Sequence, residues 1–171
     1  MMLEKRMYFF VPYNLSPIQQ GIQAGHSAVE YAREYRNDEE FIDFADNHKT
    51  WIILNGGTTN SKFDENHNRI GTLDQIAESL EANSIKYSIF IEPDLNDSLS
   101  AVCFIADERV FKLDDYPNLK DYLLQEEGIL EDMSDEQLKE EYPEEYNKWE
   151  TYIGGPGNVF LRQLLKGKKL A

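Results

Sequence analysis

The sequence contains one cysteine, Cys103, among 171 residues. No disulfide can form within the chain, and a four-cysteine zinc site is excluded. Histidine is scarce as well: His48 and His67 have no partner at the spacing of metal ligands, so we expect neither a metal nor another cofactor. No segment approaches the ~20 consecutive apolar residues of a membrane span, and the first residues lack a signal-peptide pattern. These absences favour a cytoplasmic protein with no membrane partner.

Basic residues are also few, 17 against 32 acidic residues, which gives a net charge of −15. Residues 1–107 carry a net −9, residues 108–150 a net −10, and residues 151–171 a net +4 with no acid. An acidic surface repels phosphate backbones, so we expect no general nucleic-acid binding. The final cluster of basic side chains can meet phosphate or pair with the acidic segment before it, and we favour the second use. That cluster consists of Arg162, Lys166, Lys168 and Lys169.

Short apolar segments alternate with segments of helical periodicity in the first 107 residues. Strands are expected at residues 7–13, 49–55, 87–91 and 98–105, and helices at 17–36, 39–47 and 73–82. Helical crossovers combined with one hairpin predict an α/β fold. It is a small four-stranded mixed β-sheet with helices on both faces.

The remaining residues are acidic, but tyrosines, leucines and a tryptophan recur in them at helical spacing. This pattern predicts a helical extension over residues 108–171, packed on the 1–107 core in a single compact unit. Its acidic helices span residues 114–150, and a final helix spans 159–166. The apolar side of this extension can cap a cleft of the core, which we favour, or form the contact of a homodimer.

The first predicted helix carries a polar stripe. Gln19, Gln23, His26 and Glu30 follow the spacing i, i+4, i+7, i+11, which places them on one helical face. Ser16 and Pro17 provide an N-cap and a first helical residue. Helices that follow the first strand of an open α/β sheet often border ligands. The stripe therefore predicts a ligand site, although a merely solvated face has the same pattern.

A second face of this helix is apolar, with Ile18, Ile22 and Val29. Gly21 and Gly25 cost roughly 1 kcal/mol each relative to alanine inside a helix. We expect close packing against neighbouring elements, or a site, to compensate for that cost.

The segment from Leu15 to Val29, LSPIQQGIQAGHSAV, resembles the opening of the type 2 (archaeal and eukaryotic-type) peptidyl-tRNA hydrolases. In that family a strand leads to a helix that begins Met-Ser-x-Gly-Lys-x-Ala-x-Gln-x-x-His-Ala-Ala. Gln23 and His26 are in register with its glutamine and histidine, and Ser16 matches its cap. The resemblance covers residues 7–107 and implies the same small mixed sheet.

Two positions depart from the family pattern. The catalytic lysine falls at Gln19, which cannot act as a cation. The family's Asp-Ala-Gly-x-Thr turn is shortened here to Glu92-Pro93-Asp94-Leu95-Asn96, followed by Ser100. This shorter form resembles divergent members encoded by bacteriophages, which would place the protein in a host cytoplasm.

The resemblance implies an esterase acting on peptidyl- or aminoacyl-tRNA, whose partner is the 3′ end of tRNA. Its catalytic residues would be Glu92, His26 and Gln19. Glu92 would act as the general base or orient the attacking water, and His26 would position or share the proton. Gln23, Ser100 and Gln19 would hydrogen-bond the carbonyl or its oxyanion. We expect these five side chains to line one cleft.

An alternative use of the same cleft is binding without turnover. Amide side chains read base and ribose edges, and the turn after the second strand offers Asn55, Gly57 and Thr58 to a phosphate. A plain strand-ending turn has the same sequence pattern. The ligand would be a small nucleotide, and a phage-encoded member could sequester a nucleotide-derived signal of host defence.

Overall fold

The structure is a computed structural model that describes residues 2–58, 62–127 and 133–171. Contacts divide the chain into two compact units. The first is Met1–Asp107 with Gly167–Ala171, and the second is Glu108–Lys166. Thr59 and Asn60 of the expected turn, and residues 128–132 of the expected acidic helices, lie outside the described residues.

The first unit is built on a four-stranded sheet, in the order β2-β1-β4-β3. The strands are β1 (Lys5–Val11), β2 (Thr50–Asn55), β3 (Ser88–Glu92) and β4 (Ser98–Asp107). The central strand β1 pairs parallel with β2 and antiparallel with β4, and β3 pairs antiparallel with β4. The predicted four-stranded mixed sheet is confirmed.

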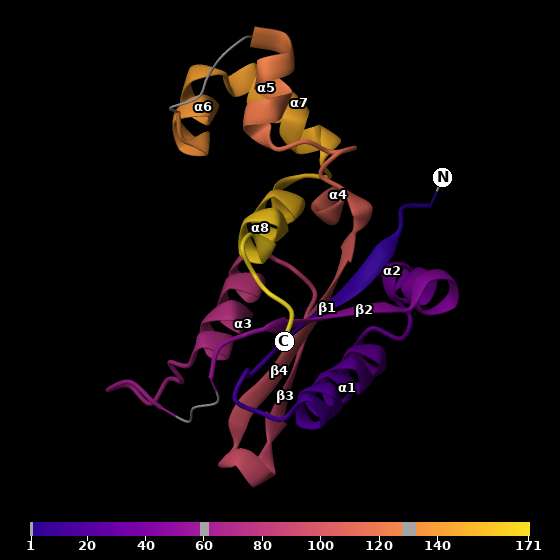
Figure 1. Ribbon diagram of the computed structural model, residues 1–171, viewed down its shortest axis with the longest axis vertical. Helices are drawn as coiled ribbons and strands as arrows, with labels where there is room; N and C mark the ends of the chain where they lie inside the picture. The colour runs from indigo at the N-terminus through magenta and orange to yellow at the C-terminus, as the bar shows by residue number, and fades with distance from the viewer. Residues whose placement is uncertain (1, 59–61, 128–132) are drawn as a thin grey trace. The chain divides into compact units, whose positions relative to one another are not determined.

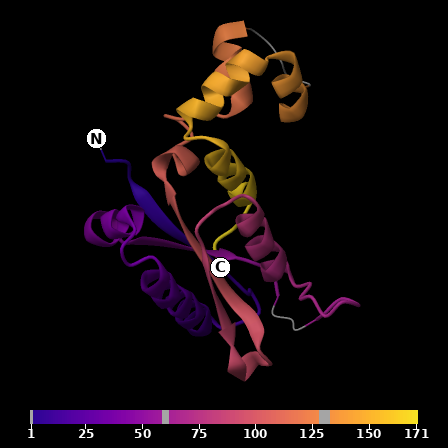
Figure 2. The same cartoon turned by 180° about the vertical axis from the view of Figure 1, so that it is seen from behind.

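Helices cover both faces of this sheet (Figure 1). Alternate residues of β1 point to opposite faces. Met7, Phe9 and Val11 pack with residues of α1 (Pro17–Glu34) in one core cluster. Phe10 points the other way. Its Cβ and a methyl carbon of Leu73, at the start of α3 (Thr72–Ala82), both lie within 3.0 Å of the position that a Cβ on Gly56 would take. The view from behind shows α1 and α3 flanking the strands on opposite sides (Figure 2).

Helix α1 begins as predicted, with the Ser16 hydroxyl accepting a hydrogen bond from Gln19 N. Its orientation differs from the expectation. Ile18 and Val29 are 76% and 67% exposed, and a Cβ added to Gly21 or Gly25 would meet no atom within 4 Å. The expected close packing of that face is therefore wrong within the described residues. The helix instead buries a mixed face that contains Gln20, Gln23, Ala24, Ser27 and Tyr31. The side chains of Gln20, Gln23 and Ser27 have hydrogen-bond partners, whereas the buried Tyr31 hydroxyl has none among the described residues.

The connection to β2 is formed by α2 (Glu39–Asp43) and a π-helical turn, Phe44–His48. Asp38 caps α2 by accepting bonds from two backbone N–H groups. Lys49 then takes a left-handed conformation, with φ 61°, and ends the turn. The predicted 39–47 helix is thus divided in two.

The last five residues belong to the first unit rather than to the helical extension. Leu170 forms an antiparallel bridge with Leu54. Asn55 N donates to Lys169 O at 2.8 Å, and Ala171 N donates to Ile53 O at 3.0 Å. This segment therefore covers the free edge of β2, which would otherwise leave backbone groups unpaired.

The second unit is helical, and its helices are α4 (Glu108–Phe111), α5 (Leu119–Glu127), α6 (Asp135–Glu141), α7 (Pro143–Tyr152) and α8 (Pro156–Leu165). It has its own core, in which Leu123, Leu138 and Ile153 are fully buried. The Arg162 guanidinium donates to two backbone carbonyls of the unit, those of Arg109 and Tyr116. The cap and the dimer contact both remain predictions.

None of the helices in the described ranges has the length and apolar character needed to cross a membrane.

Candidate functional site

A chain of side-chain hydrogen bonds joins the middle of α1 to the end of β3. The Ser100 hydroxyl donates to Gln23 Oε1, and Gln23 Nε2 donates to Glu92 Oε2 at 2.9 Å. Ser100 and Gln23 are 0% and 1% exposed. Because the oxygen and the nitrogen of the Gln23 amide each have a protein partner, its burial leaves neither atom without a hydrogen bond. The sequence brings these residues together because β3 and β4 form a hairpin beneath α1.

The Glu92 carboxylate is fixed by a second bond, because Glu92 Oε1 accepts from Asp94 N at 3.2 Å. The Gln23 amide, the Asp94 N–H and the nearby His26 together hold the pKa of Glu92 below its ordinary value. A carboxylate with a lowered pKa is ionised at neutral pH. It is a strong hydrogen-bond acceptor and a weak general base.

His26 lies one helical turn beyond Gln23 and is exposed. Its imidazole meets the Phe90 ring in an edge-to-face contact, with 4.3 Å between the centroids and an interplanar angle of 84°. Gln19 lies one turn before Gln23 and is also exposed. The exposed side chains of His26 and Gln19 thus lie on the same helix as Gln23, which orients Glu92.

The burial of Gln23 and Ser100 changes the roles that the sequence predicted for them. Neither side chain is exposed enough to hydrogen-bond a substrate carbonyl or its oxyanion. Their hydrogen bonds fix the Glu92 carboxylate, and the accessible polar side chains around them are Glu92, His26 and Gln19. Within the described residues, no hydrogen bond joins His26 directly to Glu92.

The other predicted ligand residues lie elsewhere. Asn55 and Gly57 line a separate pocket of ≈ 260 Å³, and Thr58 is exposed at the end of a described range. The Gly57 amide donates to Asn55 Oδ1 at 2.9 Å, and the Gly56 amide donates to Val11 O at 2.8 Å. The N–H groups of both glycines are therefore already paired, and the contact of Asn55, Gly57 and Thr58 with a phosphate stays a prediction.

The two glycines have a packing role instead. A Cβ on Gly56 would lie 2.4 Å from a methyl carbon of Leu73, and one on Gly57 would lie 2.8 Å from the Thr72 hydroxyl. Gly57 also has φ +106°, a conformation that residues with a side chain rarely adopt. The pair lets the end of β2 approach the start of α3.

Sequence reasoning missed Thr72, Lys168 and Lys169, which line the same pocket. No motif marks Thr72 as a ligand residue, and the charge pattern favours pairing of Lys168 and Lys169 with the acidic segment. The charge pattern alone could not show that the last residues pair with β2.

No protein-family model matches this chain, and no curated protein matches it either. The likeness to type 2 peptidyl-tRNA hydrolases therefore rests on the quoted residues. In the described part of the chain, no group of three or more histidine, cysteine or acidic side chains is arranged to hold a metal ion.

Proposed function

We propose that this protein binds a small nucleotide-type ligand at the Glu92 site, without turnover. The observation that carries the proposal is the fixed, ionised Glu92 carboxylate, held by Gln23 and by Asp94 N. Such a carboxylate accepts hydrogen bonds from the paired hydroxyls of a ribose. Its lowered pKa suits recognition better than proton abstraction.

The exposed neighbours fit the rest of a nucleoside. Bases stack on aromatic side chains, and the His26 ring is supported by Phe90. The Gln19 amide carries both a donor and an acceptor, which matches the edge of an adenine. Gln19 stands where the type 2 peptidyl-tRNA hydrolases have a catalytic lysine, and an uncharged amide suits binding better than catalysis.

The first test identifies the ligand and then measures how much the Glu92 carboxylate contributes to its affinity. Mass spectrometry of material released from heat-denatured protein is expected to show an intact nucleotide. In a thermal-shift panel of nucleotides, Glu92→Gln should weaken binding about tenfold, the equivalent of one charge-assisted hydrogen bond of ~1.5 kcal/mol. Asp97→Asn is the matched control, because it removes the same charge from the same turn.

No released nucleotide, together with no thermal shift across the panel, would end the proposal. Equal affinities for wild type and Glu92→Gln would place the ligand elsewhere.

Ester hydrolysis of peptidyl- or aminoacyl-tRNA is the second candidate. The observation that favours it is the placement of His26: it lies one turn beyond Gln23, which hydrogen-bonds Glu92, and its ring packs on Phe90 of the strand that ends at Glu92. An exposed imidazole beside a carboxylate can take a proton from an attacking water. Incubation with labelled peptidyl-tRNA, against a His26→Ala control, separates the two functions. Release that depends on His26 would replace the binding proposal with the hydrolase.

A further inference from the structure

The pocket completed by the last residues of the chain is separate from the Glu92 site and shares no residue with it. Eight residues line it: Asn55, Gly56, Gly57, Thr72, Ile76, Gly167, Lys168 and Lys169. None of them is acidic, although the chain as a whole carries a net charge of −15. Lys168 and Lys169 are the charged residues in this lining, so its formal charge is positive.

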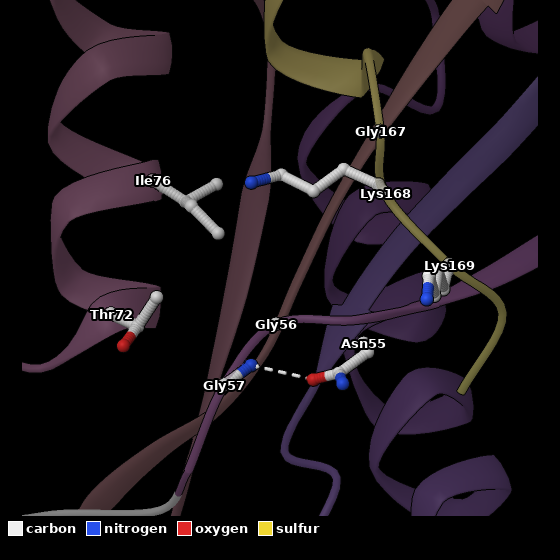
Figure 3. A pocket seen from close by; sticks show the side chains of 8 residues that line it. All are labelled: Asn55, Gly56, Gly57, Thr72, Ile76, Gly167, Lys168 and Lys169. Carbon is white, nitrogen blue, oxygen red and sulfur yellow. Dashed lines mark hydrogen bonds between the residues drawn. The ribbon is translucent and has the colours of Figure 1, made fainter.

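Pairing of the last residues with β2 puts these lysines in place. The Lys169 carbonyl accepts from Asn55 N, and the bridge between Leu54 and Leu170 continues the pairing. Figure 3 shows the Lys168 side chain extending from this segment toward Ile76 of α3. Within the described ranges, no ion pair involves either lysine.

Neutral donors supplement the lysines. Because Asn55 Oδ1 accepts from Gly57 N, the orientation of the Asn55 amide is set, and its NH₂ group is left without a partner among the described residues. Thr72 adds a hydroxyl, and it is the first residue of α3. The first N–H groups of a helix lack intrahelical partners and favour anions. One of them is already taken, because the Asp74 carboxylate accepts from Gly71 N.

We infer that this pocket is a binding site for the phosphate group of a small ligand. Lysine ammoniums, a side-chain amide and a hydroxyl are donors that suit phosphate oxygens. The volume of ≈ 260 Å³ is below the ~300–1,000 Å³ of most small-molecule sites, so it fits a phosphate or diphosphate rather than a whole nucleotide. A net charge of −15 disfavours a long nucleic acid as the occupant.

The test is calorimetric titration of the full chain with inorganic phosphate and with pyrophosphate at low salt. Lys168→Gln/Lys169→Gln is expected to weaken pyrophosphate binding about tenfold or more. The matched control is Lys148→Gln/Lys166→Gln, which makes the same change in net charge at exposed lysines outside the pocket and should change affinity less than about twofold.

A second variant, Asn55→Asp, keeps an acceptor for Gly57 N and replaces the free NH₂ with a carboxylate oxygen. It should abolish pyrophosphate binding with no loss of melting temperature, so failure to fold does not obscure the result. Absence of phosphate and pyrophosphate binding in the wild type would overturn the inference. Equal affinities in wild type and the Lys168/Lys169 variant would overturn it too.

Two further measurements distinguish this inference from nucleic-acid binding and from the proposed function at Glu92. A short single-stranded RNA without a terminal phosphate should bind more weakly than pyrophosphate. If it binds more tightly and needs both lysines, the occupant is a nucleic-acid backbone and the inference fails. Glu92→Gln should leave pyrophosphate affinity unchanged, so this site can stand when the proposed nucleotide function fails.

Discussion

The Gln23 amide hydrogen-bonds to Glu92 across 69 residues of sequence, and it also accepts from Ser100 in the core. One buried glutamine thus links the central part of α1 to both strands of the β3–β4 hairpin. The Glu92 carboxylate is partly exposed, but its orientation is set from inside the protein. A ligand that meets this carboxylate would find it already oriented.

Replacing Gln23 with leucine is expected to destabilise the fold by about 1–3 kcal/mol, because a buried hydrogen-bonding group and a bond to a charged group are lost together. The pKa of Glu92 should rise toward its ordinary value, since one donor to its charged form is gone. Urea unfolding measures the first effect and NMR titration the second. Gln19→Leu, on the exposed side of the same helix, should change stability by less than about 0.5 kcal/mol. Similar effects of the two variants would contradict the positioning role of Gln23.

Glu92 also predicts the sign of a pH effect. Because the pKa of this carboxyl is lowered in the folded protein, its contribution to stability is complete above the ordinary value of 4.5 and is lost as the pH falls through the folded value. Wild type should therefore exceed Glu92→Gln in stability at pH 7, and the difference should shrink below pH 4.5. Denaturant unfolding at a series of pH values measures it. Parallel stability curves for the two proteins would show that Glu92 gains nothing from its partners.

The strands and the main helices were predictable because their signals are local. Ser16, Pro17 and the apolar run before them locate the start of α1, and the GG pair after β2 marks the end of that strand. The orientation of α1 was not predictable from periodicity. Its buried face contains Gln20, Gln23 and Ser27, whose burial is favourable because hydrogen bonds satisfy their polar atoms. For Gln23 the partners, Glu92 and Ser100, lie 69 and 77 residues away in the sequence.

Of the two candidate sites, one could be predicted from the sequence and the other could not. Gln19, Gln23, His26, Glu92 and Ser100 could be grouped because the polar stripe of the first helix and the resemblance to type 2 peptidyl-tRNA hydrolases both point to them. The pocket containing Lys168 and Lys169 could not be found, since it depends on backbone pairing between residues more than 110 positions apart. Nothing in the composition of so short a segment indicates a strand.

Cys103 is expected to be unreactive in the folded protein. The residue is 0% exposed, its thiol donates to Ser27 O at 3.3 Å, and burial raises its pKa to about 12. Because the thiolate is the reactive form, labelling with a disulfide reagent at pH 8 should be roughly 100-fold slower than in denaturant. Absorbance of the released thiol reports the rate, and the chain has no second cysteine to confuse it. Rapid stoichiometric labelling of the folded protein would contradict the buried placement.

Alanine substitutions at the glycines should have opposite effects on stability. Gly25→Ala fills open space on α1 and should stabilise the protein by about 1 kcal/mol, the usual difference between the two residues in a helix. Gly56→Ala would place its Cβ 2.4 Å from Leu73 and should destabilise by about 1–3 kcal/mol, the usual range for overpacking. Thermal and urea unfolding of both variants measure the pair, with Gly21→Ala as a second member of the stabilising class. A destabilising Gly25→Ala would mean that a neighbour covers this face of α1 in solution, for example a second copy of the chain. A neutral Gly56→Ala would mean that the end of β2 does not approach α3 as closely as the structure has it.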